Sequence, residues 1–224
     1  MESTLYHGSN KIVEHPSLTG GQIHNDFGQG FYCTPDMQMA CEWACGAREQ
    51  AFVNCYSLEP GFSLEICDLS KANYHVLNWL ALLLRNRVFE TRHSVPSAIK
   101  AYILETFLPD VSFFDIIRGY RADDSYFSIA SAFIEGSITL GQLSAALKLG
   151  ELGEQVFLQS EKAFEALVFT TALPVDRERY LPRRMERDEK ARTAFRKMRE
   201  NTADGILAID IFREKWTNED ERLR

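Results

Sequence analysis

Apolar residues along this chain recur at two different spacings, which predict short strands and amphipathic helices. Short or alternating apolar runs predict strands at residues 5–9, 31–33, 52–58, 62–66, 111–117, 155–159 and 168–174. Apolar positions repeated every three or four residues predict helices at residues 35–48, 73–89, 97–107, 126–133, 139–149 and 187–201, with short helices after Ser160 and Gly205. The two kinds of element are therefore mixed along most of the chain.

One stretch, residues 26–43, combines glycines, aromatic residues and a predicted helix start. Gly28 and Gly30 predict a sharp turn, or a place where the backbone lies close to another group. A short strand follows, and Thr34 is the expected N-cap of a helix with Pro35 at its first position. The tyrosine of this strand, Tyr32, either presents an aromatic face to a flat ligand or fills the core.

Length and composition indicate a soluble globular protein. The 224 residues suit one domain, or one domain with a helical extension, and 45% of them are hydrophobic and 25% charged. The longest apolar run, at residues 79–84, is far shorter than a membrane span, and the N-terminus lacks the features of a signal peptide. We therefore expect a cytoplasmic protein without a membrane partner.

Five cysteines are spread over the first third of the chain without the paired spacing of a zinc site. Cys41 and Cys45 lie one helical turn apart, but no cluster of histidines and cysteines completes a metal site around them. Buried, reduced thiols are the expected state in a cytoplasmic protein. No metal is predicted.

The net charge of −7 conceals a basic segment. Residues 177–199 contain ten Lys or Arg and four Asp or Glu, a net charge of +6, which leaves −13 for the rest. The acidic body argues against general binding to a phosphate backbone. We predict that the segment is an interaction surface outside the catalytic domain, for an acidic inhibitor or a nucleic acid. We expect a helix packed on its own domain through Ala191, Ala194, Phe195 and Met198, and a solvated helix face is the alternative.

Several motifs together resemble a bacterial family of unnamed function related to ADP-ribosyltransferases. The main motifs are Tyr-His-Gly-Ser at residues 6–9, Asp-Phe-Gly-Gln-Gly-Phe-Tyr at residues 26–32 and the stretch at residues 38–44. Trp79 with Asn86 and Arg87, Gly119 with residues 122–124, and residues 154–157 with 160–163 follow in the same order. The resemblance covers residues 5–167. It implies an α+β fold with an ADP-ribosyltransferase-like split β-sheet core and surrounding helices, in a domain at residues 1–174 followed by a charged, helical extension at 175–224.

The resemblance also implies a cleft that holds NAD with residues from three strands. His7 would bond a ribose hydroxyl, and Tyr32 would stack on the nicotinamide ring, with Gly8 and Gly30 allowing close backbone approach. The third position is typically glutamate, but Gln155 stands here, and Glu154 beside it should face the other way. The implied cofactor-binding set is His7, Gly8, Ser9, Phe27, Gly28, Gly30, Tyr32, Thr34, Asn86, Arg87 and Asp123, with His7, Tyr32 and Gln155 catalytic.

The chemistry of such a site is dominated by charge. Breaking the bond between nicotinamide and ribose builds positive charge on the sugar, whereas nicotinamide leaves as a neutral molecule, so no general acid is needed. A carboxylate would stabilise this charge better than Gln155, and Asp123 or Asp124 is a candidate to supply one. Asn86 and Arg87 either bind phosphate or cap a helix, and Trp43, Trp79 and Phe31 are expected in the core.

The function implied by the resemblance is mono-ADP-ribosyl transfer from NAD to a macromolecular acceptor, a protein or a nucleic acid. Stand-alone members of this kind look like bacterial toxins, effectors or defence components, which implies an inhibitor or antitoxin protein as a further partner. An NAD glycohydrolase is one alternative. The other, favoured by Gln155, is a protein that binds a nucleotide or a partner in a degenerate NAD cleft without turnover.

Overall fold

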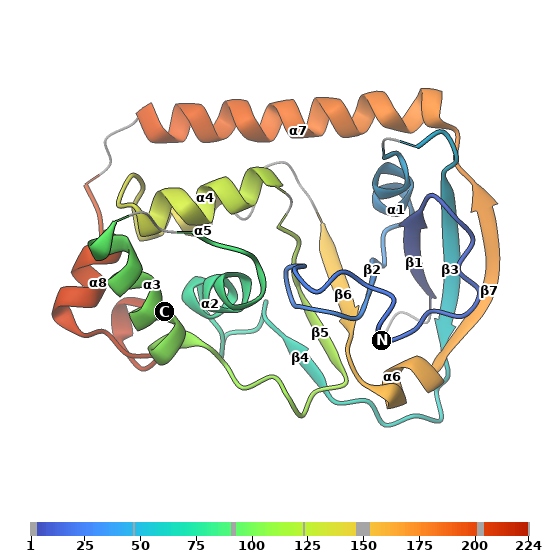
Figure 1. Ribbon diagram of the computed structural model, residues 1–224, viewed down its shortest axis with the longest axis horizontal. Coiled ribbons are helices and arrows are strands. Elements are labelled where there is room, and N and C mark those ends of the chain that lie inside the picture. The colour runs from blue at the N-terminus through green and yellow to red at the C-terminus, as the bar shows by residue number, and fades with distance from the viewer. Residues whose placement is uncertain are drawn as a thin grey trace.

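Two antiparallel or mixed β-sheets form the centre of the protein, with helices around them (Figure 1). The computed structural model describes residues 4–46, 48–90, 93–122, 124–146, 153–200 and 204–223. The three-stranded antiparallel sheet has the order β1 (Thr4–Ser9), β3 (Phe52–Leu58) and β7 (Leu167–Pro174). The four-stranded sheet has the order β2 (Phe31–Cys33), β6 (Glu154–Leu158), β5 (Ile116–Tyr120) and β4 (Ile66–Asp68), with only β4 and β5 parallel. The predicted α+β class is confirmed.

The two sheets meet at a single bridge between β1 and β2. Tyr6 and Thr34 exchange two backbone hydrogen bonds of 2.9 Å, and the strands pair nowhere else among the described residues. On β1, His7 and Gly8 follow this bridge immediately, and on β2 Tyr32 lies just before it. The sheets therefore diverge beside these three residues, which leaves room for side chains and for a cavity.

The helices gather mainly on the side of the four-stranded sheet. Their bounds are α1 (Met37–Ala44), α2 (Val76–Asn86), α3 (Ser94–Phe107), α4 (Asp124–Ile134), α5 (Leu140–Ala146), α6 (Glu161–Glu165), α7 (Arg177–Glu200) and α8 (Ala208–Glu214), and a 3₁₀ turn follows at Glu221–Leu223. The apolar α2 is buried on every side over residues 77–84, and α3, α4, α5 and α8 contribute to the same core. A separate small core lies between α1 and the three-stranded sheet, where Ala40, Val53 and Tyr180 are buried.

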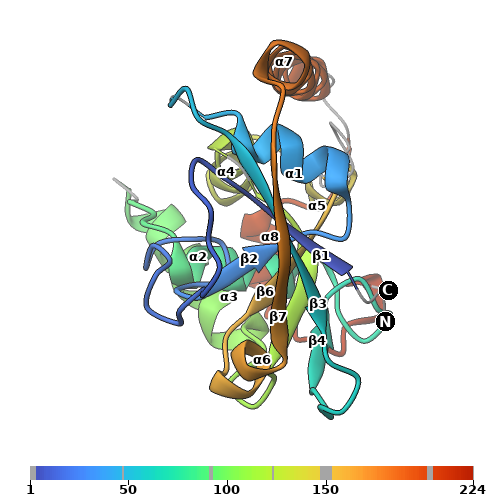
Figure 2. The ribbon, with the colours of Figure 1, turned by 90° about the vertical axis from the view of Figure 1, so that its right-hand side faces the viewer.

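The helix α7 crosses one side of the molecule from the end of β7 toward α8 (Figures 1 and 2). It contacts α1 near its beginning and α4 further along. Ala191 is buried, and Phe195 and Met198 pack against the large core, which confirms the predicted intramolecular docking through these residues. The helix begins ten residues earlier than predicted, at Arg177, and continues through Pro182. Tyr180, buried against α1, holds this additional part in place.

Several element boundaries differ from the sequence prediction for local reasons. Asp36, not Thr34, caps α1, because its Oδ1 accepts hydrogen bonds from the N–H groups of Gln38 at 2.8 Å and Met39 at 3.2 Å. The strand predicted at residues 111–117 begins only at Ile116, since Asp110 forms a turn by accepting from the N–H of Ser112 at 3.0 Å. Likewise, the strand predicted at 62–66 lies at Ile66–Asp68.

Other predictions agree closely with the structure. Ser160 caps α6, its hydroxyl accepting from the N–H of Ala163 at 3.0 Å, and β2 and β3 have the predicted bounds. All five cysteines are buried and free. Within the ranges that the structure describes, none of the helices has the length and apolar character needed to cross a membrane.

Candidate functional site

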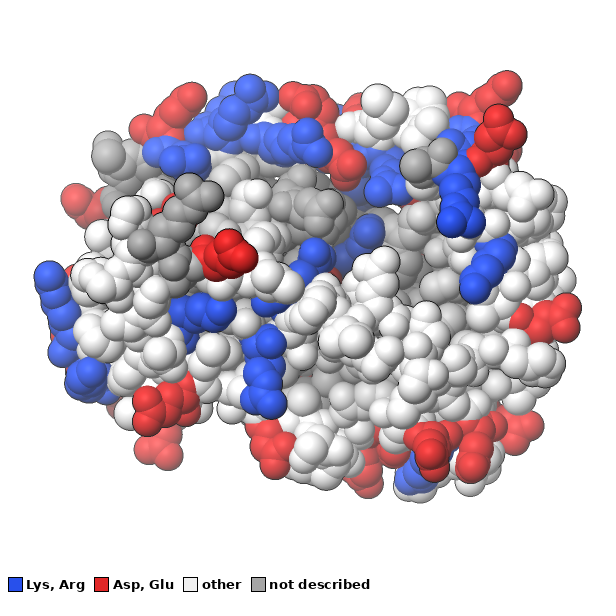
Figure 3. Space-filling model, in the orientation of Figure 1, with Lys and Arg blue, Asp and Glu red and all other residues white. Residues whose placement is uncertain are grey.

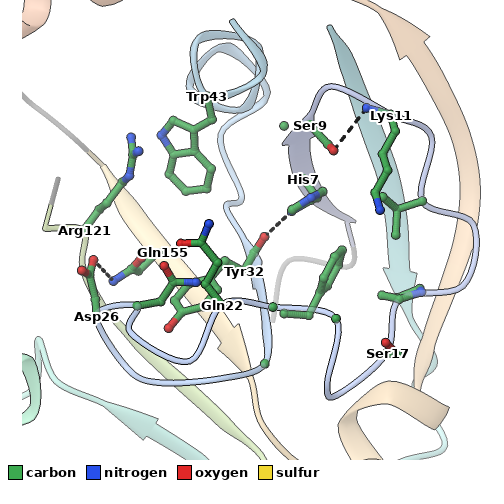
Figure 4. A pocket seen from close by; sticks show the side chains of 18 of the residues that line it. His7, Ser9, Lys11, Ser17, Gln22, Asp26, Tyr32, Trp43, Arg121 and Gln155 are labelled. Atoms are coloured by element: carbon green, nitrogen blue, oxygen red, sulfur yellow. Dashed lines mark hydrogen bonds between the residues drawn. The ribbon is translucent and has the colours of Figure 1, made fainter. Parts of the chain in front are cut away.

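A cavity of about 560 Å³ opens where the two sheets diverge (Figure 4). Side chains of β1, β2 and β6 line it, together with the loop between β1 and β2, one face of α1, the segment after β5, and α7. Its volume lies within the usual range for small-molecule and cofactor sites. Because its lining residues come from both sheets, the cavity exists only in the folded domain.

His7 of β1 is held on β2 by a hydrogen bond of 2.7 Å between its Nδ1 and the carbonyl oxygen of Tyr32. Its ring also lies 4.5 Å from that of Phe31, measured between ring centroids. Burial lowers the pKa of His7, although the bond to the carbonyl raises it. The neutral imidazole therefore carries its proton on Nδ1, and Nε2 is left as a hydrogen-bond acceptor.

Tyr32 of β2 is locked at both its ring and its hydroxyl. The hydroxyl donates to the carbonyl oxygen of Gly28 at 2.8 Å and accepts from the N–H of Phe27 at 3.0 Å. The ring lies 4.6 Å from that of Phe157, between centroids, at 37°. Burial raises the pKa of the phenol, so it stays neutral. The half-buried ring thus reaches the cavity in one fixed orientation.

Gln155 of β6 is only 3% exposed and is oriented by two acceptors. Its Nε2 donates at 3.2 Å both to Oδ2 of Asp26 and to the carbonyl oxygen of Tyr120. Because a carboxylate and a carbonyl oxygen only accept, the amide nitrogen must face them. The amide oxygen accepts no hydrogen bond from the described residues and is left for the cavity that Gln155 lines.

Asp26 connects this amide to the rest of the domain. It is 5% exposed, and its carboxylate accepts from Nε of Arg87 at 2.9 Å and from the N–H of Ala122 at 2.8 Å in addition to Gln155. Arg87 also donates to the carbonyl oxygen of Ala122 at 2.8 Å. The negative charge of Asp26 is therefore balanced by Arg87, and one carboxylate ties together the loop before β2, the end of α2, the segment after β5, and β6.

The register of β6 agrees with the sequence prediction. Gln155 lines the cavity, whereas Glu154 forms an ion pair with Arg118 of β5, with 3.0 Å between Arg118 Nη2 and Glu154 Oε2. Successive side chains of a strand point to opposite faces, so Glu154 cannot take the position of Gln155 without a shift of one residue. The carboxylate that contacts Gln155 is instead that of Asp26.

The structure brings together only part of the predicted binding set. The predicted residues that line the cavity are His7, Gly8, Ser9, Gly30, Tyr32, Arg87 and Gln155. Phe27, Gly28, Thr34 and Asn86 do not line it. Asp123 and the side chain of Asp124 lie outside the described residues.

Each of the four predicted residues outside the cavity has a structural role. Phe27 is buried in the large core against Phe157, and Thr34 is fully buried at the bridge between the sheets. Gly28 adopts a φ of +101°, which favours glycine, so the predicted turn is present. Asn86 donates to the carbonyl oxygen of Leu82 at 2.9 Å and so completes the end of α2, the capping alternative for this residue.

The two glycines expected to admit a ligand make room for the protein itself. A Cβ on Gly8 would stand 2.0 Å from the carbonyl oxygen of Ala40, and one on Gly30 would stand 2.5 Å from that of Leu158. Both obstacles are backbone atoms, which cannot move aside cheaply. Gly8 thus lets α1 pack directly on β1, and Gly30 lets the loop pack on β6.

The lining of the cavity also includes residues that were not predicted as site residues, among them Trp43, Arg121 and Arg184. Trp43 of α1 was expected in the core, yet it is half-buried and lines the cavity, with the guanidinium carbon of Arg121 4.7 Å from the centre of its ring. Arg184 reaches the same cavity from α7, although the basic segment was expected to lie outside the catalytic domain. Trp43 lies in the motif at residues 38–44, which gave no sign of a role in a cavity, and no local motif marks Arg121 or Arg184, because only the tertiary structure brings the three together. Trp79 and Phe31 are buried as expected.

The charge of the cavity is opposite to that of the whole chain. Its basic lining residues are Lys11, Arg87, Arg121 and Arg184, whereas Asp26 is its one acidic lining residue among those described. Figure 3 shows Lys and Arg side chains along α7 and in the hollow below it. Since the chain as a whole carries −7, this concentration favours an anionic ligand at this place. No group of three or more metal-ligating side chains occurs among the described residues.

Comparison with known protein families gives a match over residues 3–169, to the family described as Protein of unknown function (DUF3990). The chain belongs to this family. The DUF3990 region includes the three strands that carry His7, Tyr32 and Gln155, whereas α7 with Arg184 lies beyond it. No curated protein and no solved structure gives a significant match to the chain.

Proposed function

We propose that the cavity binds NAD and that the protein transfers ADP-ribose from it to a macromolecular acceptor. One arrangement carries the proposal: His7, Tyr32 and Gln155, from three different strands, line a single cavity of about 560 Å³. This is the arrangement implied by the resemblance of the motifs around them to those of ADP-ribosyltransferases. The excess of basic side chains in the cavity suits a dinucleotide that carries two phosphates.

In this proposal each of the three side chains has one role. Tyr32 stacks on the nicotinamide ring, because its own ring is already fixed in orientation. His7 accepts a hydrogen bond from a ribose hydroxyl through Nε2, since Nδ1 is engaged by the carbonyl oxygen of Tyr32. Gln155 presents its amide oxygen to the nicotinamide ribose. Together they hold the dinucleotide bent, so that the glycosidic bond is exposed to an acceptor.

The amide of Gln155 is assisted by the residues behind it. As the glycosidic bond breaks, positive charge grows on the ribose, and the oxygen of Gln155 offers it only a dipole. Asp26 accepts a hydrogen bond from the same amide, which increases the electron density on that oxygen. Arg87 neutralises Asp26, however, so the added stabilisation is smaller than that of a glutamate at this position. We therefore expect slow turnover.

A second function, nucleotide binding without turnover, is favoured by the same neutral side chain. Gln155 and the balanced pair of Asp26 and Arg87 leave the described lining without an uncompensated carboxylate beside the ribose. The cavity would then serve as a receptor for NAD or a related nucleotide. NAD hydrolysis is the third outcome, if water takes the place of the acceptor. Consumption of NAD separates the two enzymes from the receptor, and transfer of label to a macromolecule separates the transferase from the hydrolase.

The experiment incubates the purified protein with NAD labelled in the adenylate phosphate, with and without cell lysate. Label that becomes bound to macromolecules, and that protease or nuclease releases, supports the transferase and identifies the class of acceptor. Release of nicotinamide without bound label indicates the hydrolase. NAD binding without either product indicates the receptor, and no measurable binding of NAD would overturn all three.

Tyr32→Ala provides the test of the site itself. Loss of ring stacking should weaken NAD binding by about 1–3 kcal/mol, the range for base–aromatic stacking. Tyr32→Phe retains the ring and should bind NAD much more tightly than the alanine variant. Tyr74→Ala, at a tyrosine that does not line the cavity, is the matched control and should leave binding unchanged. Equal losses in Tyr32→Ala and Tyr74→Ala would show that the cavity is not the NAD site.

A further inference from the structure

Three side chains outside the strand triad form a second part of the cavity, here called the basic wall: Trp43, Arg121 and Arg184. Figure 4 shows the side chain of Arg121 extending from beside Asp26 and Gln155 to the ring of Trp43. Arg121 lies over the ring of Trp43, 4.7 Å from its centre. Arg184 extends from α7 to the same cavity. Two guanidinium groups and an indole therefore face a single space.

The indole N–H of Trp43 has no hydrogen-bond partner in the part of the chain that the structure describes, although its nitrogen is buried. The other two tryptophans are satisfied: Nε1 of Trp79 donates to the carbonyl oxygen of Tyr120 at 3.1 Å, and Nε1 of Trp216 donates to Glu214 at 2.9 Å. A buried donor without a partner is costly, and such groups are uncommon in folded proteins. The donor of Trp43 thus requires an acceptor that the described residues do not provide.

Arg184 is positioned by the protein but forms no ion pair with the described residues. One Nη1 hydrogen bond of 2.8 Å reaches the carbonyl oxygen of Cys45, at the end of α1. The ion pairs of the described residues do not include Arg184, whereas Arg187, one turn later on α7, pairs with Glu42. The guanidinium of Arg184 keeps four further N–H donors. Its position is thus fixed, while its charge remains available.

We propose that the basic wall is a binding subsite for a phosphate group, which Arg184 and the indole N–H of Trp43 contact directly and Arg121 supports by its charge. Guanidinium groups match phosphate oxygens in geometry and charge, and the indole N–H supplies one further donor. The acidic body outside the cavity makes a nonspecific anion site here unfavourable. Arg184 lies beyond the DUF3990 region, so α7 completes the subsite from outside that region.

A phosphate of the NAD donor and a phosphate of a nucleic-acid acceptor share this chemistry. In the first case the subsite holds the diphosphate of NAD, which rests on the proposed function. In the second case it positions the acceptor beside the ribose. Binding of inorganic diphosphate tests the subsite itself, because this probe requires no reaction and no contact with His7, Tyr32 or Gln155.

The first experiment observes the tryptophan N–H signals of ¹⁵N-labelled protein by NMR during titration with inorganic diphosphate. We expect the signal of Trp43, assigned by its loss in Trp43→Phe, to move with saturation. The signals of Trp79 and Trp216 should stay in place, because their N–H groups already have partners. Movement of all three signals equally, or of none at millimolar diphosphate, would overturn the subsite.

The second experiment measures diphosphate affinity by calorimetry in matched variants. Arg184→Gln should weaken binding about tenfold, and Trp43→Phe, which loses only the N–H donor, about threefold to tenfold. Arg183→Gln removes the same charge from the adjacent, exposed residue, which does not line the cavity, and should change the affinity less than twofold. Equal effects of Arg183→Gln and Arg184→Gln would contradict the proposal, because they would indicate only general attraction to α7.

NAD and an oligonucleotide then distinguish the two sources of phosphate. If Arg184→Gln weakens the binding of NAD and of diphosphate in parallel, the subsite holds a phosphate of the donor. If it weakens the binding of diphosphate and of a short oligonucleotide but not that of NAD, the subsite holds a phosphate of the acceptor. Diphosphate binding that depends on Arg184, without any binding or consumption of NAD, would support the subsite and refute the proposed function. NAD binding in a protein that fails both diphosphate tests would refute the subsite and leave the proposed function standing.

Discussion

The two walls of the cavity differ in how their polar groups are satisfied. On the strand wall, formed by His7, Tyr32 and Gln155, the side chains are held by hydrogen bonds of 2.7 to 3.2 Å to the backbone and to Asp26. On the basic wall, the indole N–H of Trp43 has no partner among the described residues, and Arg184 has one backbone acceptor. On the strand wall the side chains are held by partners within the protein, whereas the basic wall has hydrogen-bond donors that the described residues do not use.

This difference separates stability from binding. Substitutions on the strand wall break bonds that exist in the free protein, so they should lower the free energy of unfolding as well as ligand affinity. Substitutions on the basic wall remove donors that a ligand would use, so they should lower affinity with little loss of stability. The predictions below test this separation, beginning with the largest expected effect.

Gly8→Ala should have the largest effect, because Gly8 lies where β1 meets the helix that carries Trp43. The added Cβ would stand 2.0 Å from the carbonyl oxygen of Ala40 and 2.7 Å from the amide nitrogen of Ala44. Relief requires α1 to move, and we expect a loss of more than about 3 kcal/mol in the free energy of unfolding. Urea denaturation measures it. In Gly46→Ala the Cβ meets no atom within 4 Å, so this control should lose less than about 0.5 kcal/mol.

Asp26→Asn and Glu42→Gln compare two similar ion pairs, one behind each wall. Asp26 pairs with Arg87 behind Gln155, and Glu42 pairs with Arg187 and holds α7 on α1. In both pairs the carboxylate side chain is 6% exposed and the arginine side chain is 22% exposed. Breaking either pair leaves a half-buried guanidinium without its counter-ion, so each variant should lose about 3 kcal/mol in the free energy of unfolding. Urea denaturation measures both losses.

Their effects on ligands should differ, since only Asp26 orients Gln155. Calorimetry at a temperature where both variants are folded should show that Asp26→Asn weakens the binding of NAD more than that of diphosphate. Glu42→Gln should weaken the binding of diphosphate more than that of NAD, because α7 carries Arg184. If both variants lose more affinity for the same one of the two ligands, the two walls are not independent.

The strand wall could be predicted from the sequence because each of its residues lies in a short local motif. The motifs at residues 6–9, 26–32 and 154–157 place His7, Tyr32 and Gln155 on strands, and alternation along β6 then puts Gln155 and not Glu154 on the cavity. The same motifs also contain residues that support the fold. The motifs therefore predict a ligand contact for Phe27 and Thr34, although both are buried and do not line the cavity.

The basic wall could not be predicted in this way. Its side chains come from α1, from the segment after β5 and from α7, and no spacing in the sequence connects them. The charge count identified the basic segment but not the direction of any one arginine. That direction depends on the docking of Tyr180, Arg184 and Arg187 against α1. Whether the chain divides into domains at residue 174 stays a prediction.

Gln155→Glu tests whether the usual glutamate can function in this site. The new carboxylate would face Asp26, whose oxygen lies 3.2 Å from the present amide nitrogen. The carbonyl oxygen of Tyr120 would lose one of its two side-chain donors and keep Nε1 of Trp79. We expect a loss of about 2 kcal/mol in the free energy of unfolding at pH 7. The nearby negative charge raises the pKa of the new carboxyl above its unfolded value of about 4.3, so this loss should shrink as the pH falls toward 4.

Glu154→Gln is the matched control for this variant, since its side chain faces Arg118 on the other side of the sheet. It should lose less than about 1 kcal/mol, and it should leave NAD binding unchanged. Urea denaturation at pH 4.5, 5.5 and 7 gives the stability of both variants. A Gln155→Glu protein that is as stable as the wild type at pH 7, and that consumes NAD faster, would show that Asp26 does not prevent a glutamate site.

The smallest expected effect is the dependence of stability on pH through His7. Burial holds the pKa of His7 below its ordinary value, so between about pH 6.5 and the folded pKa the unfolded chain binds a proton that the native protein does not. The wild type should therefore lose stability as the pH falls through this interval, by at most about 1.4 kcal/mol per pH unit from this group.

His7→Gln retains a polar side chain but cannot titrate. Urea denaturation of both proteins at pH 7.5, 6.5 and 5.5 isolates the contribution of His7, because His75, whose pKa is also lowered, cancels in the difference. The free-energy difference between wild type and variant should fall from pH 6.5 to 5.5 and stay constant above. NAD affinity of the wild type should decline only below this interval, as the pH falls through the folded pKa of His7, because a protonated Nε2 no longer accepts a bond from ribose. A constant difference at all three pH values would mean that His7 is solvated and is not held neutral by the strand wall.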